Sequence, residues 1–376
     1  MSTTLAAPVE TAVPTRRVRP TRRGFLLLPA GLSMLAGLDA ALLLLGVPAP
    51  VSTERLPEVH GVLMVLGFVG TLVALERAVA LGRRLGFAAP VLLGAGGLAL
   101  LSPAPLAVGQ SLLVGGTAAL VALYVPLWRR QRDEAVLVQA LGAALGGGGA
   151  LLWLAGIDVA LLLPWLAAFL VLTIGGERLE LARLAMGPTA GPVLVLLSAV
   201  LALAVLLSLL VPTVGHPALG VAVLALGGWL ATHDVARRTV RSPGLPRYLA
   251  AGMLGGYAWL AVAGGIWALG GAAYEGARYD AVVHAVFLGF TLSMVMAHAP
   301  VILPAVLRRP LPYHPGLWAP LLLLHGSLVL RTWVGDGLGV PEVWQVAGVL
   351  NVASLLLFVV VAAWSTLRPA SPGGHR

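Results

Sequence analysis

Apolar runs of about 20 residues recur along almost the whole sequence, separated by short polar segments. A helix needs about 20 apolar residues to cross a hydrocarbon core of about 30 Å. The runs fall at 24–46, 58–81, 86–105, 109–128, 135–156, 159–176, 190–212, 216–233, 248–270, 281–304, 316–334 and 343–366. Only 10% of the 376 residues are charged, against about 25% in a soluble domain. The sequence therefore predicts an all-α polytopic membrane protein with twelve transmembrane helices.

The positions of the arginines predict the orientation of these helices. All 24 basic residues are arginine, and alternating loops place 21 of them on one side, leaving Arg55, Arg278 and Arg331 on the other. Cytoplasmic loops carry an excess of basic residues. We therefore expect both termini in the cytoplasm, in the cytoplasmic membrane of a bacterium. Membrane orientation explains the net charge of +9, so nucleic-acid binding is not expected.

Polar segments flank the apolar region at both ends. Residues 1–23 are polar and rich in proline and arginine, and residues 367–376 are short and polar. Segments with few apolar residues do not bury enough surface to fold. We expect a disordered basic cytoplasmic tail at 1–23, one transmembrane domain at 24–366 and a cytoplasmic tail at 367–376.

The absence of cysteine narrows the possible metal chemistry. With no cysteine in the chain, disulfides, iron–sulfur clusters, thiolate zinc sites and covalent haem attachment are excluded. Histidine, methionine and carboxylate side chains remain as metal ligands. A histidine inside hydrocarbon is costly and usually has a partner or a ligand.

Two histidines are predicted to lie at the same depth on different helices. His60 and His284 each stand about one turn inside the outer end of a span, after Glu58 and Asp280 respectively. Histidines at one depth on separate helices can provide nitrogen ligands to both faces of a haem. The alternative is that each only hydrogen-bonds a neighbouring helix.

Other histidines and methionines suggest further ligands. His298 stands about 21 Å along the helix from His284 on the same predicted face, with Thr291 between them, so this face is expected to line one cavity. His325 falls in the middle of its span. Because Met64 lies one turn from His60, a soft copper(I) site is a second interpretation, although methionine also serves as apolar filler.

Several charged side chains are also predicted within or beside spans. Asp39 is a carboxylate well inside the first span, where it needs a cation or carries protons. Arg331 suits a haem propionate, or it extends to the interface or pairs with Asp336. Glu76-Arg77 and the segment 177–180 are interpreted as interfacial ion pairs.

Short motifs resemble those of a known family. The matching positions are His60, Met64 and Gly67-Phe68 in the second span, Gly175-Gly176-Glu177-Arg178 after the sixth, His284-Ala285, Gly289, Met294 and Arg309-Pro310-Leu311 around the tenth, and Leu328 to Arg331 in the eleventh. Together they resemble the NnrS family of haem- and copper-containing membrane proteins associated with nitric oxide stress and denitrification. Val62 and Leu63 stand where that family has a histidine and a glutamate.

The resemblance implies haem b with His60 and His284 as ligands, possible copper, and nitric oxide as a small ligand. The chain is also distantly similar to the catalytic subunits of haem–copper oxidases. Those enzymes hold a second metal with histidines on spans 6 and 7, and spans 6 and 7 contain no histidine here. A complete reductase is therefore not expected.

Three functional hypotheses follow from the sequence. The first is a haem-binding membrane protein that handles nitric oxide or supports denitrification. The second is a secondary transporter of a small solute or metal ion, with Asp39, His298 and His325 along its path. The third is a b-type electron-transfer or nitric oxide reductase-like subunit. A haem spectrum separates the second from the others, and reduction by quinol separates the third from the first.

Overall fold

The computed structural model describes residues 25–307 and 311–367. Regular structure within these ranges is helical throughout, and no strand occurs among them. The predicted tails lie outside the described residues, apart from residue 367 at the end of the last helix. Arg308, Arg309 and Pro310 lie outside them as well.

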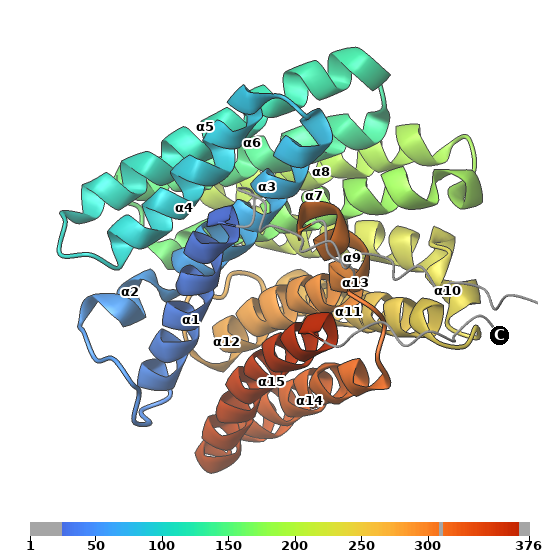
Figure 1. Cartoon of the computed structure of the whole chain (residues 1–376). Helices are drawn as coiled ribbons and strands as arrows, with labels where there is room; N and C mark the ends of the chain where they lie inside the picture. The colour runs from blue at the N-terminus through green and yellow to red at the C-terminus, as the bar shows by residue number, and fades with distance from the viewer. Residues whose placement is uncertain (1–24, 308–310, 368–376) are drawn as a thin grey trace, which may run out of the picture.

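The first half of the chain forms a series of helices joined by short loops (Figure 1). Its elements are α1 (Leu27–Leu44), α2 (Arg55–Val62), η2 (Leu63–Gly70), α3 (Thr71–Leu81), η3 (Arg84–Phe87), α4 (Ala88–Leu100), α5 (Leu106–Gln131), α6 (Glu134–Leu154) and α7 (Val159–Met186). The helices α4, α5 and α6 lie side by side in Figure 1.

The second half continues in the same way. Its elements are α8 (Ala190–Leu210), α9 (Pro212–His233), α10 (Ala236–Thr239), α11 (Leu245–Gly270), α12 (Gly276–His284), η4 (Ala285–Leu292), α13 (Ser293–Leu307), η5 (Pro315–Leu317), α14 (Trp318–Val329), η6 (Leu330–Asp336) and α15 (Pro341–Leu367). The last two long helices, α14 and α15, pack against each other.

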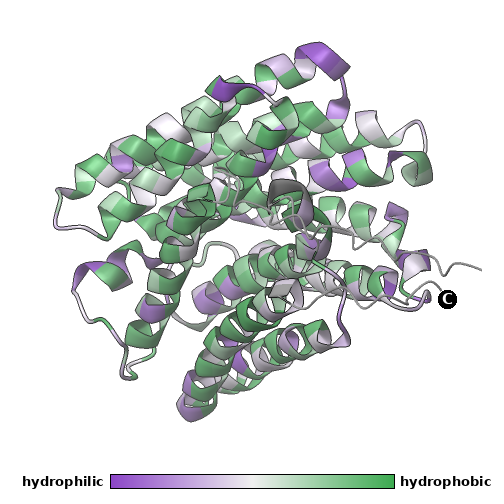
Figure 2. Cartoon of the chain, in the orientation of Figure 1, coloured by the Kyte–Doolittle hydropathy of each residue, from purple (hydrophilic) through white to green (hydrophobic). Residues whose placement is uncertain are grey.

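Eleven helical segments within the described residues are long and apolar enough to cross a membrane. The prediction of an all-α multi-pass membrane protein is confirmed. Figure 2 shows apolar residues along most helices and hydrophilic residues mainly near their ends. Leu196, Leu203 and Val221 are each more than half exposed, as expected of side chains that face lipid rather than water.

The predicted third span is shorter than the sequence suggested. The run 86–105 forms a helical segment only over Arg84–Leu100, because Pro103 and Pro105 lack a backbone N–H and disfavour helix in the residue before them. The loop after α4 nevertheless meets the start of α2. The Arg55 guanidinium donates to the carbonyl oxygens of Ser102 and Ala104 at 2.5 and 2.7 Å. The segment from Arg84 to Leu100 therefore runs back to the end of the bundle where α2 begins.

Three segments of π-helix interrupt the α-helices, at η2, η4 and η6. The segment η4 begins directly after His284, η2 begins three residues after His60, and η6 contains Arg331. A π-helix bonds residue i to residue i+5 and is frequent at functional sites. It also changes the angular relation between residues before and after it, which a prediction based on uniform α-helix misses.

Small residues allow the closest helix approach between α9 and α11. A Cβ atom at Gly220 would lie 2.2 Å from the backbone nitrogen of Ala268 and 2.5 Å from the carbonyl oxygen of Gly264. Helix association in lipid depends on such close van der Waals packing, because the lipid chains are as apolar as the helix surfaces. Gly220 is therefore a packing residue of the bundle.

We expect Gly220→Ala to destabilise the protein, because the methyl group meets backbone that has no rotamer with which to move away. A loss of about 1–3 kcal/mol is typical of such overpacking. Gly228 on the same helix has open space around its Cα, so Gly228→Ala should be neutral or slightly stabilising. Unfolding of both variants in detergent measures the difference, and equal stabilities would contradict the packing role.

Candidate functional site

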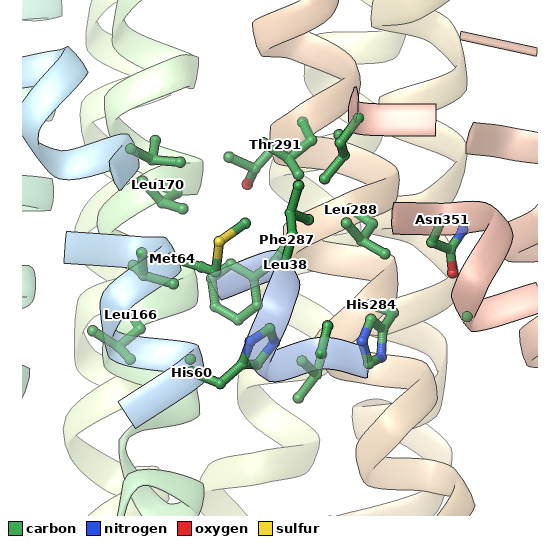
Figure 3. A pocket seen from close by; sticks show the side chains of 18 of the residues that line it. Leu38, His60, Met64, Leu166, Leu170, His284, Phe287, Leu288, Thr291 and Asn351 are labelled. Carbon is green, nitrogen blue, oxygen red and sulfur yellow. The ribbon is translucent and has the colours of Figure 1, made fainter. Parts of the chain in front are cut away.

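An apolar cavity lies between α1, α2, η2, α7, α12, η4, η6 and α15 (Figure 3). It encloses about 880 Å³ of space not filled by atoms, part of which belongs to its opening. Its wall is formed mainly by leucine and valine side chains. Six polar side chains interrupt this wall, namely His60, Tyr279, His284, Thr291, Arg331 and Asn351.

His60 presents one ring nitrogen to the cavity because the other is held by the backbone. Its Nδ1 lies 2.9 Å from the carbonyl oxygen of Gly37 on α1. Because a carbonyl only accepts, this contact requires a proton on Nδ1 and leaves Nε2 of the neutral ring as a lone-pair donor. Nε2 has no hydrogen-bond partner among the described residues.

His284 is held in the same way, by a carbonyl oxygen of its own helix. Its Nδ1 lies 2.8 Å from the carbonyl oxygen of Asp280 and 3.3 Å from the Asp280 carboxylate. Metal-binding histidines usually donate their second ring nitrogen to a carbonyl or carboxylate, which fixes the tautomer. In both imidazoles Nδ1 is therefore held by a carbonyl, and Nε2 is the nitrogen left to bind a ligand.

The two histidines come together as the sequence predicted. Figure 3 shows their imidazoles at the same end of the cavity, on helices from opposite sides, with Thr291 towards the other end. Residues 224 positions apart thus share one site, and both rings have an available Nε2. Ligation itself stays a prediction.

Met64 also faces this cavity and packs against Gly37 on α1. A Cβ atom at Gly37 would overlap the Met64 sulfur. Gly37 therefore has two roles at the site: its carbonyl oxygen holds His60, and its missing side chain makes room for Met64. Nothing in the sequence motif around His60 pointed to a residue on the first helix.

Arg331 pairs with Asp280, and not with Asp336 as one interpretation of the sequence suggested. Its Nε and Nη2 each donate to an Asp280 carboxylate oxygen at 2.7 Å. The guanidinium also lies 4.8 Å from the ring centroid of Trp344, whose Nε1 donates to Asp280 at 3.2 Å. Asp280 thus connects Arg331 with His284. Its position four residues before His284 was the available sequence signal for this contact.

Two polar atoms in the cavity wall lack partners. The Thr291 hydroxyl and the Asn351 side-chain carbonyl are buried without a hydrogen bond among the described residues. Buried polar groups are normally satisfied. The Asn351 amide nitrogen does donate to Ser327 at 2.7 Å, whereas its oxygen has no partner among the described residues.

His298 does not reach this cavity, which corrects the expectation of one continuous face from His284 to His298. The π-helical segment η4 lies between them, so the angular relation of a uniform α-helix does not apply to this pair. The His298 Nε2 lies 3.0 Å from the guanidinium of Arg178, and its Nδ1 lies 2.8 Å from the carbonyl oxygen of Met294. Both ring nitrogens therefore already have partners.

His325 likewise has partners at both ring nitrogens. Trp259 donates to its Nδ1 at 2.9 Å, and its Nε2 lies 3.1 Å from the Ser293 hydroxyl. Since Nδ1 accepts, the proton is on Nε2, and the ring joins α11, α13 and α14. This contact satisfies a polar group in the middle of the span without any ligand.

Asp39 also lies outside the cavity wall. One carboxylate oxygen accepts from the backbone N–H of Val51 at 3.2 Å. The other is buried without a partner among the described residues. The structure therefore gives Asp39 no cation within reach in the part of the chain that it describes.

The side chains do not form a protein-only metal centre. No group of three or more histidine, aspartate or glutamate residues that could hold a metal ion occurs within residues 25–307 and 311–367. A haem needs fewer protein ligands than a bare ion, since the porphyrin supplies four nitrogens. The two imidazoles thus fit an axial role better than a four-ligand site.

Fold and cavity define an all-helical multi-pass membrane protein with a histidine-bearing internal cavity. Over residues 23–367 the chain matches the family described as "Domain of unknown function (DUF8744)", and it belongs to that family. No curated protein and no solved structure was found to match it.

A buried ion pair holds the opposite end of the bundle together around Asp234. Arg178 donates to both Asp234 oxygens at 2.8 and 3.0 Å, and the Tyr257 hydroxyl donates at 2.7 Å. Burial raises the pKa of Asp234, but the hydrogen bonds and charge of Arg178 more than offset this. The pKa therefore lies below its ordinary value.

Asp234 should contribute stability at neutral pH that disappears in acid. A carboxylate with a lowered folded-state pKa stabilises the fold above its unfolded pKa of about 3.9, and this stabilisation is lost as the pH falls through the folded pKa. Asp234→Asn should cost about 3–5 kcal/mol at neutral pH, because it leaves Arg178 buried without a counter-charge. The difference from the wild type should shrink in acid.

Unfolding measured at neutral and acidic pH tests this expectation. The exposed Glu54, changed to glutamine, provides the control and should follow the wild type at both. An Asp234→Asn variant with an unchanged pH profile would contradict the assigned role of the ion pair.

Proposed function

We propose that the protein is a haem-binding membrane protein of NnrS type, with His60 and His284 as axial ligands of one haem b. The observation that carries the proposal is that the two imidazoles have the same hydrogen-bonding arrangement. Each has Nδ1 fixed by a backbone carbonyl and Nε2 available in the same apolar cavity. A haem bound there would supply an iron able to change oxidation state by one electron, and it would bind a small gas such as nitric oxide only when one of the two imidazoles leaves the iron.

The cavity wall supports this proposal in two further ways. Its leucine and valine side chains suit the apolar face of a porphyrin and exclude water from it. Arg331 lines the cavity, and its Nη1 makes no hydrogen bond among the described residues. That nitrogen is the one available to a propionate, while Nε and Nη2 stay with Asp280.

The cavity wall also contains side chains that suit copper. The Met64 thioether is a soft ligand and the His60 imidazole a borderline one, and both line the cavity. Such ligands suit copper(I). The proposed physiological role is nitric oxide handling or support of denitrification, rather than complete turnover by a reductase.

The transporter hypothesis has less support from the geometry. It placed Asp39, His298 and His325 along one path. None of the three lines the cavity, and both histidines already have two partners each. An electron-transfer role shares the haem site and differs only in requiring a redox partner.

We propose twelve crossings with both termini in the cytoplasm. The contact of Arg55 with the loop after α4 supports a full crossing by the short segment Arg84–Leu100. The excess of arginine at the opposite end of the bundle supports the orientation. The helices would then place the histidine cavity towards the outer side of the membrane.

Single cysteines test this topology in a chain that has none of its own. We expect Glu54→Cys and Ala104→Cys to react with a membrane-impermeant thiol reagent in intact bacterial cells. Arg84→Cys should react only after permeabilisation. Labelling of Ala104→Cys in the pattern of Arg84→Cys would show that α4 does not cross.

The haem assignment predicts a specific loss of cofactor. Purified wild-type protein should show a b-type visible spectrum and a pyridine haemochrome, and His60→Ala and His284→Ala should each lose most of the bound haem. The matched control is His233→Ala, at an exposed histidine on α9. Equal haem content in the wild type and in His284→Ala would refute the assignment, and metal analysis of the same samples tests for copper.

A further inference from the structure

A second polar cluster, with buried and partly exposed members, lies at the arginine-rich end of the bundle, away from the histidine cavity. We call it the acidic cluster. Its members are Glu76 and Arg77 on α3, Tyr124 on α5, Gln139 on α6, and Glu177 and Glu180 on α7. The sequence predicted simple ion pairs here, and the structure shows a cluster with unequal charges.

Arg77 is shared between two carboxylates. Its Nη2 lies 2.6 Å from Glu76, and its Nη1 lies 2.9 Å from Glu180. Gln139 accepts from Arg77 at 3.2 Å and donates to Glu180 at 3.3 Å. Both Nη atoms of this guanidinium are engaged with carboxylates, and its Nε is buried without a partner among the described residues. One arginine charge therefore acts on two contacting carboxylates and on a third that forms no ion pair with it.

Glu177 is that third carboxylate. It forms no ion pair or hydrogen bond with any described residue, and its Oε1 is buried without a partner. The charged groups that act on it are Glu76, Arg77, Glu180 and Arg178. An ionised carboxylate without a counter-charge is costly in a low-dielectric interior. Protonation removes that cost.

Arg178 forms no ion pair with Glu177, because its guanidinium is engaged with both oxygens of Asp234 and with His298. The end of α7 thus carries two charged clusters. In one of them a single arginine matches a single aspartate, and in the other a single arginine faces three glutamates. The second cluster differs from the first by its excess of negative charge.

An unpartnered hydroxyl provides independent support for a ligand in the acidic cluster. The Tyr124 side chain is 1% exposed, and its hydroxyl has no hydrogen bond among the described residues. This hydroxyl lies within electrostatic range of Arg77 and of all three glutamates. A buried hydroxyl that is left unsatisfied beside surplus carboxylates indicates a polar occupant between them.

We propose that the acidic cluster is a proton-binding site, in which Glu177 carries an exchangeable proton at neutral pH. Binding forms the O–H bond of a carboxylic acid, and release returns a proton to solvent with no change in oxidation state. Glu76 and Glu180 have side chains that are 23% and 36% exposed. They provide the route between Glu177 and the surface.

Infrared spectroscopy of the purified full-length protein tests this site. Wild type at neutral pH should show the carbonyl stretch of a protonated carboxylic acid, and the band should disappear as the pH is raised. Glu177→Gln should lose the band. Glu54→Gln, at an exposed carboxylate, should retain it. Tyr124→Phe should keep the band and change the pH at which it disappears.

Measurements on the same variants can also contradict the proposal. Glutamine closely resembles a protonated glutamate, so Glu177→Gln should fold with at least wild-type stability at neutral pH. A variant that does not fold would show that an ionised Glu177 is required. A band that persists in Glu177→Gln, or is absent from the wild type, would also refute the site. None of these readouts depends on haem binding.

Discussion

The cost of leaving a polar group without a partner in hydrocarbon governs this structure. The bundle contains few charged or imidazole side chains, and most of them contact another buried polar group across helices. Arg331 pairs with Asp280, and Arg178 pairs with Asp234. The exceptions are therefore informative. The Nε2 atoms of His60 and His284 face a cavity without partners, and Glu177 lacks a counter-charge.

The π-helical segments lie in the wall of the cavity. Each of the three contains a residue of that wall, and His298, which follows η4, does not line the cavity. The π-helical segment η4 accounts for the main error of the sequence interpretation. A uniform helix places His284 and His298 on one face, whereas the helix in the structure gives them separate environments.

The two ends of the bundle differ in chemistry. The end with His60 and His284 has an apolar cavity, with its arginine charge neutralised by Asp280. The arginine-rich end has no comparable histidine pair among the described residues, and it holds an ion pair and an acidic cluster instead. Both the ion pair and the acidic cluster include a residue near the end of α7, Arg178 in the first and Glu177 in the second.

The sequence by itself determined the class of protein and most helix positions, and it identified His60 and His284 as candidate ligands. Hydropathy is a local property, and a span of about 20 apolar residues in lipid has no alternative to a helix. Counting residues from the ends of the spans predicted one depth for His60 and His284, and the structure places both in one cavity wall. The tertiary structure alone decided the partners: Gly37 for His60, Asp280 for Arg331, Asp234 for Arg178, and none for Glu177. These contacts join residues from separate helices. Their geometry depends on how each helix is rotated about its axis and on how closely helices approach at glycines, and the hydrophobic periodicity of the sequence determines neither.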